Sequence, residues 1–113
     1  MKGVIWTCDR GRDGIKQLQY IRDRYLWAGI SIIREVYTRD NAWVEFSNGD
    51  YWRVASACES SCGIRSNIAL VDARASDEFV RTVIMRTLCC GNGPRHYEFF
   101  MPRSDNHIEA NVK

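Results

Sequence analysis

The spacing of apolar residues changes once in the first part of the chain, which predicts a strand followed by a helix. Val4–Cys8 is a short, almost continuous apolar run that is typical of a buried strand. The segment Asp9–Gly14 contains two glycines and is predicted to be a loop. From Ile15 onward apolar residues recur at helical spacing, and Gly29 is placed to end this helix. The predicted order is therefore strand, glycine loop, helix.

The next part of the chain has the pattern of three strands. Ile30–Tyr37 is rich in β-branched residues, and Ala42–Phe46 and Tyr51–Ser56 follow it as two shorter runs of strand-forming residues. The last two runs are separated by Ser47–Asp50, which contains the dipeptide Asn-Gly. Asn-Gly favours the tight turn of a β-hairpin, so these two strands are predicted to pair.

The second half of the chain predicts another strand–helix–strand unit. Ile68–Val71 is apolar without alternation, as expected for a strand buried on both faces of a parallel sheet, and it is followed by Asp72. Ser76 is a suitable N-cap, and the apolar residues of Phe79–Leu88 recur at helical spacing. Tyr97–Met101 is predicted to be a final strand.

These elements predict a single α/β domain over residues 1–102, in which a mixed sheet contains an antiparallel hairpin and is packed by two main helices. Residues 103–113 form a polar tail. Of the 113 residues, 45% are hydrophobic and 27% are charged, which excludes a disordered chain. The apolar runs are far shorter than the roughly 20 residues of a membrane-spanning helix, so we expect no membrane partner and a cytoplasmic location.

Charge and cysteine content add little to this picture. The net charge of +2 is too small to indicate nucleic-acid binding by itself, although thirteen of the sixteen basic residues are Arg, which binds phosphates well. Five cysteines, an odd number, are expected to be reduced thiols. A zinc site is an alternative with unfavourable spacing, and buried small side chains are preferred. The residues that would form such a site are Cys58, Cys62, Cys89, Cys90 and His96.

The order of elements is that of a small nucleoside-triphosphatase core. Such a core binds phosphates at a loop after its first strand and holds Mg²⁺ with an acidic residue at the end of a later strand. Asp72 is the candidate metal ligand, with capping of a turn or helix as the alternative. Either the first loop binds a phosphate or it is simply solvated. Its candidate phosphate-binding residues are Arg10, Gly11, Arg12, Gly14 and Lys16.

Two segments resemble the ATPase domain of phage terminase large subunits. Phe46–Asp50 looks like the hairpin with an Asn-Gly turn in that family. Gly63–Ala73 looks like its Arg- and Gly-containing loop, followed by an apolar strand that ends in Asp-Glu. The resemblance implies a nucleotide-binding fold, Mg-ATP as the ligand and Asp72 as the residue that holds Mg²⁺.

The chain departs from this family at the positions that perform the chemistry. Ala73 replaces the Glu that would activate the attacking water. A phosphate-binding loop of the P-loop type has Gly-Lys followed by Ser or Thr, whereas Lys16 lies one residue late and Gln17 has no hydroxyl. Asp13 adds a negative charge beside the expected phosphates. These departures favour a protein without catalytic activity.

The sequence therefore predicts a non-catalytic phage-type or mobile-element binding protein on a degenerate nucleotide-binding scaffold. Its partner, a protein, a nucleotide or a nucleic acid, is left open. The alternatives are an ATPase subunit of a DNA-packaging motor with an atypical phosphate loop, and a small homo-oligomeric structural or virion-associated protein. Aromatic residues could stack on bases, although most are expected in the core. They are Trp6, Trp27, Trp43, Tyr51 and Trp52.

Overall fold

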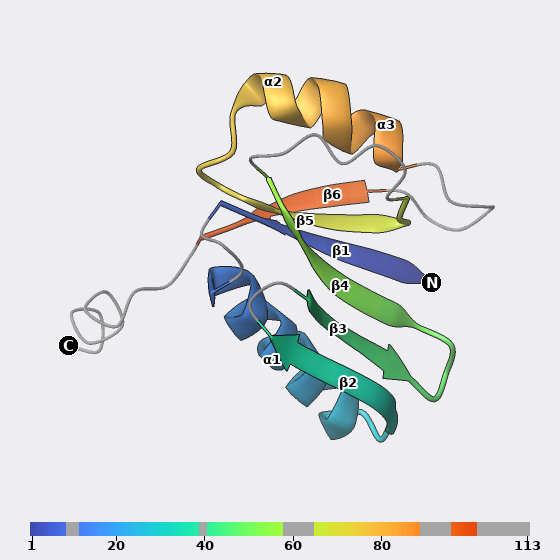
Figure 1. The fold of residues 1–113 in the computed structure, drawn as a ribbon. Helices are drawn as coiled ribbons and strands as arrows, with labels where there is room; N and C mark the ends of the chain where they lie inside the picture. The colour runs from blue at the N-terminus through green and yellow to red at the C-terminus, as the bar shows by residue number, and fades with distance from the viewer. Residues whose placement is uncertain (9–11, 39–40, 58–64, 89–95, 102–113) are drawn as a thin grey trace.

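The computed structural model describes residues 1–8, 12–38, 41–57, 65–88 and 96–101, which form a mixed sheet with a helical layer on each face (Figure 1). The predicted tail at 103–113 lies outside the described residues. In chain order the elements are β1 (Lys2–Thr7), α1 (Arg12–Trp27), β2 (Ile32–Thr38), β3 (Asn41–Phe46), β4 (Tyr51–Ser56), β5 (Ile68–Asp72), α2 (Asp77–Phe79), the π-helical segment η1 (Val80–Ile84), α3 (Met85–Thr87) and β6 (His96–Phe100).

The strands of the described residues pair in the order β2–β3–β4–β1–β5–β6. β1 is central and runs parallel to β4 on one side and to β5 on the other. β6 continues the sheet as a parallel strand beside β5, whereas β3 runs antiparallel to both of its neighbours, β2 and β4. This arrangement confirms the predicted α/β class, the mixed sheet, the hairpin and the two helices.

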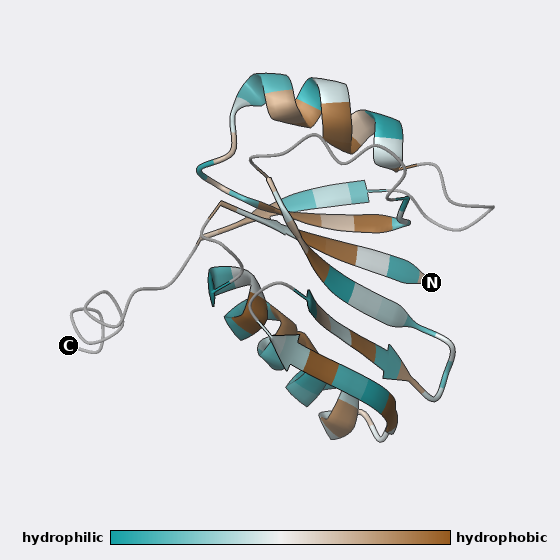
Figure 2. Ribbon diagram, in the orientation of Figure 1, coloured by the Kyte–Doolittle hydropathy of each residue, from teal (hydrophilic) through white to brown (hydrophobic). Residues whose placement is uncertain are grey.

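The two faces of the sheet pack against different helices. On one face Ile5 of β1 and Val44 of β3 belong to the same buried cluster as Leu18 of α1. On the other face Trp6 of β1 belongs to the cluster that contains Ile84 of η1. Figure 2 shows hydrophobic stretches in the central strands β1 and β5 and in the helices on both sides of the sheet. Because β1 is covered on both sides, it lacks the alternation of a half-buried strand.

The β3–β4 hairpin forms as predicted. Val44 pairs with Trp52 across it, and Gly49 in the turn has φ = 95°. A side chain is strained at that φ, which is the physical reason for glycine at this position. The hairpin places Trp52 in the core and Trp43 at a half-buried position on the opposite face.

Helix α1 begins at Arg12, three residues before the predicted start at Ile15. The loop prediction is therefore wrong for residues 12–14, which form the first helical turn. Periodicity detected only the apolar positions of the helix, whereas its first turn is Arg12-Asp13-Gly14, with no apolar residue to extend the pattern. Gly29 follows the helix with φ = 87°, as expected for a residue just past a helix end.

The helix after β5 is continuous over α2, η1 and α3, with a π-helical middle. Ser76 caps it as predicted, because its Oγ accepts a hydrogen bond from the backbone N–H of Phe79 at 3.1 Å. Val80 and Ile84 point into the core, and Arg81 and Arg86 are exposed, in agreement with the predicted apolar stripe. No helix in the described part of the chain is long and apolar enough to cross a membrane.

Candidate functional site

The connections of β1 and β5 diverge to opposite faces of the sheet at its carboxyl edge. β1 and β5 are adjacent and parallel, yet α1 follows β1 onto one face and the helix after β5 lies on the other. In open α/β sheets, ligands bind outside the carboxyl ends of strands whose connections diverge in this way. The topology therefore predicts that a ligand site, if the chain has one, includes residues that follow β1 and β5.

Asp72, the last residue of β5, is completely buried at this edge. Its Oδ1 accepts hydrogen bonds from the backbone N–H of Arg74 at 2.8 Å and from Arg74 Nε at 3.0 Å. Its Oδ2 accepts from Arg74 Nη2 at 2.7 Å and from the backbone N–H of Cys8 at 3.1 Å. Burial by itself raises the pKa of Asp72, but the hydrogen bonds from Arg74 and Cys8 outweigh it and hold that pKa below its ordinary value.

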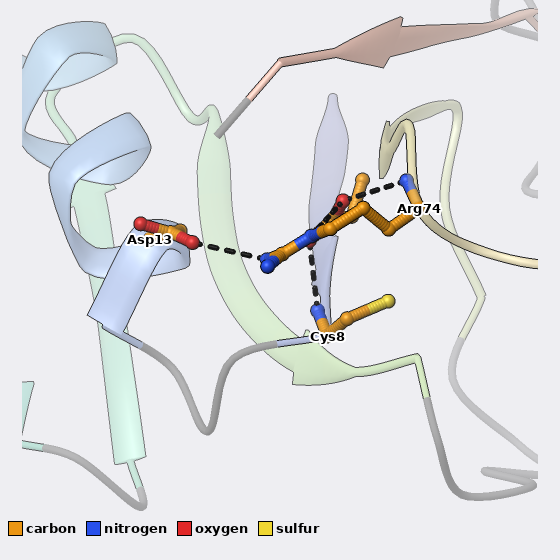
Figure 3. A network of polar contacts seen from close by, with 4 residues as sticks. Cys8, Asp13 and Arg74 are labelled. Atoms are coloured by element: carbon orange, nitrogen blue, oxygen red, sulfur yellow. Dashed lines mark hydrogen bonds and ion pairs between the residues drawn. The ribbon is translucent and has the colours of Figure 1, made fainter. Parts of the chain in front are cut away.

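Arg74 connects Asp72 to the first turn of α1. Its Nη2 also donates to Oδ2 of Asp13 at 3.0 Å, so one guanidinium bridges two buried carboxylates (Figure 3). The hydrogen bond to Asp72 raises the pKa of Arg74 further above its already high value, so the side chain stays charged. The Arg74 side chain is 52% exposed, whereas the Asp13 side chain is 6% exposed and that of Asp72 is fully buried. The network therefore ties β1, α1 and β5 together beneath a partly exposed cation.

The predicted phosphate-binding residues are not brought together as a loop. Arg10 and Gly11 lie outside the described residues. Arg12 and Lys16 are exposed, at the first position and in the second turn of α1. Gly14 is buried, and a Cβ at this position would lie 2.5 Å from Cγ1 of Val54. The geometry thus gives Gly14 a role in close packing of α1 on β4.

Asp72 does not fit the predicted role of Mg²⁺ ligand as it is placed. Both carboxylate oxygens already accept two hydrogen bonds each, and the positive charge beside them is Arg74. A magnesium ion would have to displace this guanidinium, since Mg²⁺ demands direct oxygen ligands in octahedral geometry. Within the described ranges, no cluster of three or more His, Cys, Asp or Glu residues could hold a metal.

The cysteine alternative falls mostly outside the described residues, which exclude Cys58, Cys62, Cys89 and Cys90. Cys8 is half-buried at the end of β1. His96 is exposed in β6, with its Nε2 3.1 Å from Oε2 of Glu98. The described residues therefore add nothing in favour of a zinc site.

Sequence reasoning missed the cation at the centre of the network. Arg74 lies two residues after Asp72, a spacing at which both its backbone N–H and its guanidinium reach the carboxylate. That Asp-x-Arg pattern is the signal that could have identified the pair. Its contact with Asp13, 61 residues away, has no local signature.

The chain matches no protein-family model, and no curated protein or solved structure matches it.

Proposed function

We propose that this chain is a non-catalytic binding protein of phage or mobile-element type, built on a scaffold that resembles a nucleotide-binding core. The observation that carries the proposal is the guanidinium of Arg74, which satisfies the carboxylate at the end of β5. In a phosphoryl-transfer enzyme that carboxylate supports a metal ion. Here it is used to hold the β5 end, the loop after it and α1 in place.

The residues around the network support the same conclusion. Ala73 offers no carboxylate to activate water, and it lies exposed next to Asp72. Lys16 lies on the exposed side of α1, in a regular helix rather than in a phosphate-wrapping loop. Phosphoryl transfer depends on positioned cations and a water-orienting group, and the cation held at this edge, Arg74, is engaged by two carboxylates.

The test is a measurement of phosphate release from Mg-ATP by the purified protein and by Arg74→Ala and Asp72→Ala. We expect no release from any of the three proteins. Removing Arg74 frees the carboxylate of Asp72 but supplies no phosphate-binding loop, so this variant should not gain turnover. Saturable hydrolysis by the unmodified protein that disappears in Asp72→Ala would contradict the proposal and favour the ATPase subunit of a DNA-packaging motor.

A thermal-shift titration with Mg-ATP separates nucleotide binding from turnover. A ligand at about a hundred times its Kd stabilises the folded state by roughly 2.7 kcal/mol. A saturable shift without phosphate release would identify the nucleotide as the binding partner. An absent shift would leave a protein or a nucleic acid in that role.

A second candidate, the oligomeric structural protein, is favoured by the edge of the sheet. In β6, Tyr97 and Phe99 form an edge-to-face pair with ring centroids 5.8 Å apart, and both side chains are exposed. Within the described residues, no strand pairs with the outer edge of β6. Exposed edges with apolar side chains are sites of strand pairing between chains. Light scattering over a range of concentrations tests this, and a monomer at all of them counts against it.

A further inference from the structure

One part of the sheet surface has no helix over it in the described residues. On the face opposite α1, the buried cluster contains residues of β1, β4, β5 and the helix after β5. It contains no residue of β2 or β3. Side chains alternate along a strand, and Val44 and Trp52 point into the cluster beneath α1. Trp43 of β3 and Tyr51 of β4 therefore lie on this uncovered face.

Aromatic and charged side chains lie next to one another on this face, with Val36 of β2 paired to Trp43. The rings of Trp43 and Tyr51 are 6.0 Å apart, with an angle of 34° between their planes. Arg53 pairs directly with Trp43 across the β3–β4 ladder, and Lys2 pairs with Tyr51 across the β1–β4 ladder. Arg34 of β2 lies beside Glu45, with an ion pair of 3.1 Å. We call Lys2, Arg34, Trp43, Glu45, Tyr51 and Arg53 the sheet platform.

The charge of the platform is complementary to an anionic ligand. Three cationic side chains and one carboxylate give a net charge of +2 on these six residues. The carboxylate of Glu45 is engaged by Arg34, whereas within the described residues neither Lys2 nor Arg53 has an acidic partner. The Arg34 side chain is 71% exposed, and Trp43, Tyr51 and Arg53 are half-buried, as expected of a flat surface.

We propose that the sheet platform binds single-stranded DNA. Proteins bind single strands by stacking bases on aromatic rings while basic side chains follow the phosphates, and the platform has both groups on one face of the sheet. Stacking requires bases that are not already paired, which excludes a duplex as the preferred ligand. Base stacking and phosphate contacts do not distinguish deoxyribose from ribose, so no preference for RNA is expected.

This inference goes beyond the proposed function and uses another surface. Lys2 and Tyr51 start their strands, whereas Asp72 ends β5, so the platform lies toward the amino ends of the parallel strands. A protein that fails to bind DNA still passes the test for absent hydrolysis, and one that hydrolyses ATP can still bind DNA at the platform. Failure of the DNA-binding proposal can therefore be distinguished from failure of the proposed non-catalytic function.

The experiment is a fluorescence-anisotropy titration with labelled oligo(dT) of about 12 nucleotides, a length within the usual site sizes for single-strand binding. At about 50 mM salt we expect saturable binding. Trp43→Ala and Tyr51→Ala should each weaken it by roughly 5- to 150-fold, because each removes one stacking surface. Trp43→Phe and Tyr51→Phe keep a ring and should retain most of the affinity.

Matched controls separate the platform from general effects. Trp27, whose side chain is 93% exposed at the end of α1, is an accessible tryptophan outside the platform, so Trp27→Ala should bind like the unmodified protein. Arg53→Ala should reduce the slope of log K against log salt by about 0.7, the contribution of one phosphate contact to a single strand. Arg81→Ala, which removes an exposed arginine of η1, should leave the slope unchanged.

Three results would overturn the assignment. The first is no binding of oligo(dT) at low salt by a protein whose circular dichroism shows it folded. The second is an equal loss of affinity in Trp27→Ala and Trp43→Ala. The third is tighter binding, by about tenfold or more, of a DNA duplex or of RNA with the same sequence, since either would require recognition that stacking does not supply.

Discussion

The carboxylate of Asp72 accepts four hydrogen bonds, and three of them come from Arg74. Such a group is stable in the interior only while its donors remain, because a buried charge without partners loses its hydration and gains nothing in return. Arg74 is half exposed, so water can replace part of what its guanidinium provides. Loss of Arg74 is therefore expected to destabilise the fold mainly because the buried carboxylate of Asp72 is left with fewer hydrogen bonds.

We predict that Arg74→Ala lowers the free energy of unfolding by about 1–3 kcal/mol, because Asp72 loses two of its four hydrogen bonds and Asp13 loses the one from Nη2. Urea unfolding followed by circular dichroism measures this change. Arg81→Ala is the matched control, since Arg81 is exposed and should change stability by less than about 0.5 kcal/mol. Equal stability of Arg74→Ala and the unmodified protein would mean that the network contributes nothing.

The lowered pKa of Asp72 predicts the direction of the pH dependence. A carboxyl whose pKa is lower in the folded than in the unfolded state stabilises the fold above its unfolded pKa, about 3.9. That contribution is lost as pH falls through the folded pKa. The stability advantage of the unmodified protein over Asp72→Asn should therefore be largest near neutral pH and shrink progressively below about pH 5. Urea unfolding at several pH values measures it, and an advantage that grows on acidification would refute this assignment.

At the scale of elements, the contact between α1 and the sheet depends on a residue without a side chain. Thr7 and Val54 both approach Gly14, and an added Cβ would lie 2.5 Å from Cγ1 of Val54 and 3.1 Å from Cγ2 of Thr7. Alanine at this position gains up to about 1 kcal/mol of helix propensity. Overpacking a close contact costs about 1–3 kcal/mol, so the clash should win.

Gly14→Ala is thus predicted to destabilise the protein by about 1–2 kcal/mol, measured by chemical unfolding. Val54→Ala removes the nearest atom, so the double variant Gly14→Ala/Val54→Ala should be more stable than the two single effects added together. Additive effects would contradict the packing explanation and reopen a role for Gly14 in ligand binding.

Most elements could be predicted from local patterns, but their arrangement could not. Alternation, the Asn-Gly turn and the Ser76 cap act within a few residues, so β3, β4 and the start of the second helix were predictable. The placement of β1 between β4 and β5 depends on pairing between distant segments, which leaves no local trace. The π-helical segment η1 likewise depends on how Val80 and Ile84 fit the core.

The candidate site was predictable only in part, for the same physical reason. The strand-end position of Asp72 follows from the apolar run before it, and that position was found. The Asp-x-Arg spacing brings the guanidinium to the carboxylate locally, whereas the contacts of Asp72 with Cys8 and of Arg74 with Asp13 are tertiary and leave no local signal. The orientation of Trp43 similarly required the hairpin register, because a shift of one residue would exchange the two faces.

At the scale of the whole molecule, the polar network and the platform lie on opposite ends of the parallel strands. Arg74 contacts Asp72 and Asp13, whereas Trp43 contacts Tyr51, so among the described residues the two groups share no partner. Substitutions at sites without shared partners usually have additive effects on stability. We therefore expect substitutions in the polar network to change stability without changing DNA binding, and substitutions in the platform to change DNA binding without disturbing the network.

This separation predicts the behaviour of the double variant Arg74→Ala/Trp43→Ala. Its change in unfolding free energy should equal the sum of the single changes within about 0.5 kcal/mol, as urea unfolding without DNA can measure. Its affinity for oligo(dT) should match that of Trp43→Ala, and Arg74→Ala alone should bind like the unmodified protein at a temperature where both are folded. A loss of affinity in folded Arg74→Ala would show instead that the network shapes the platform, because a change at one end could reach the other only through the strands that join them.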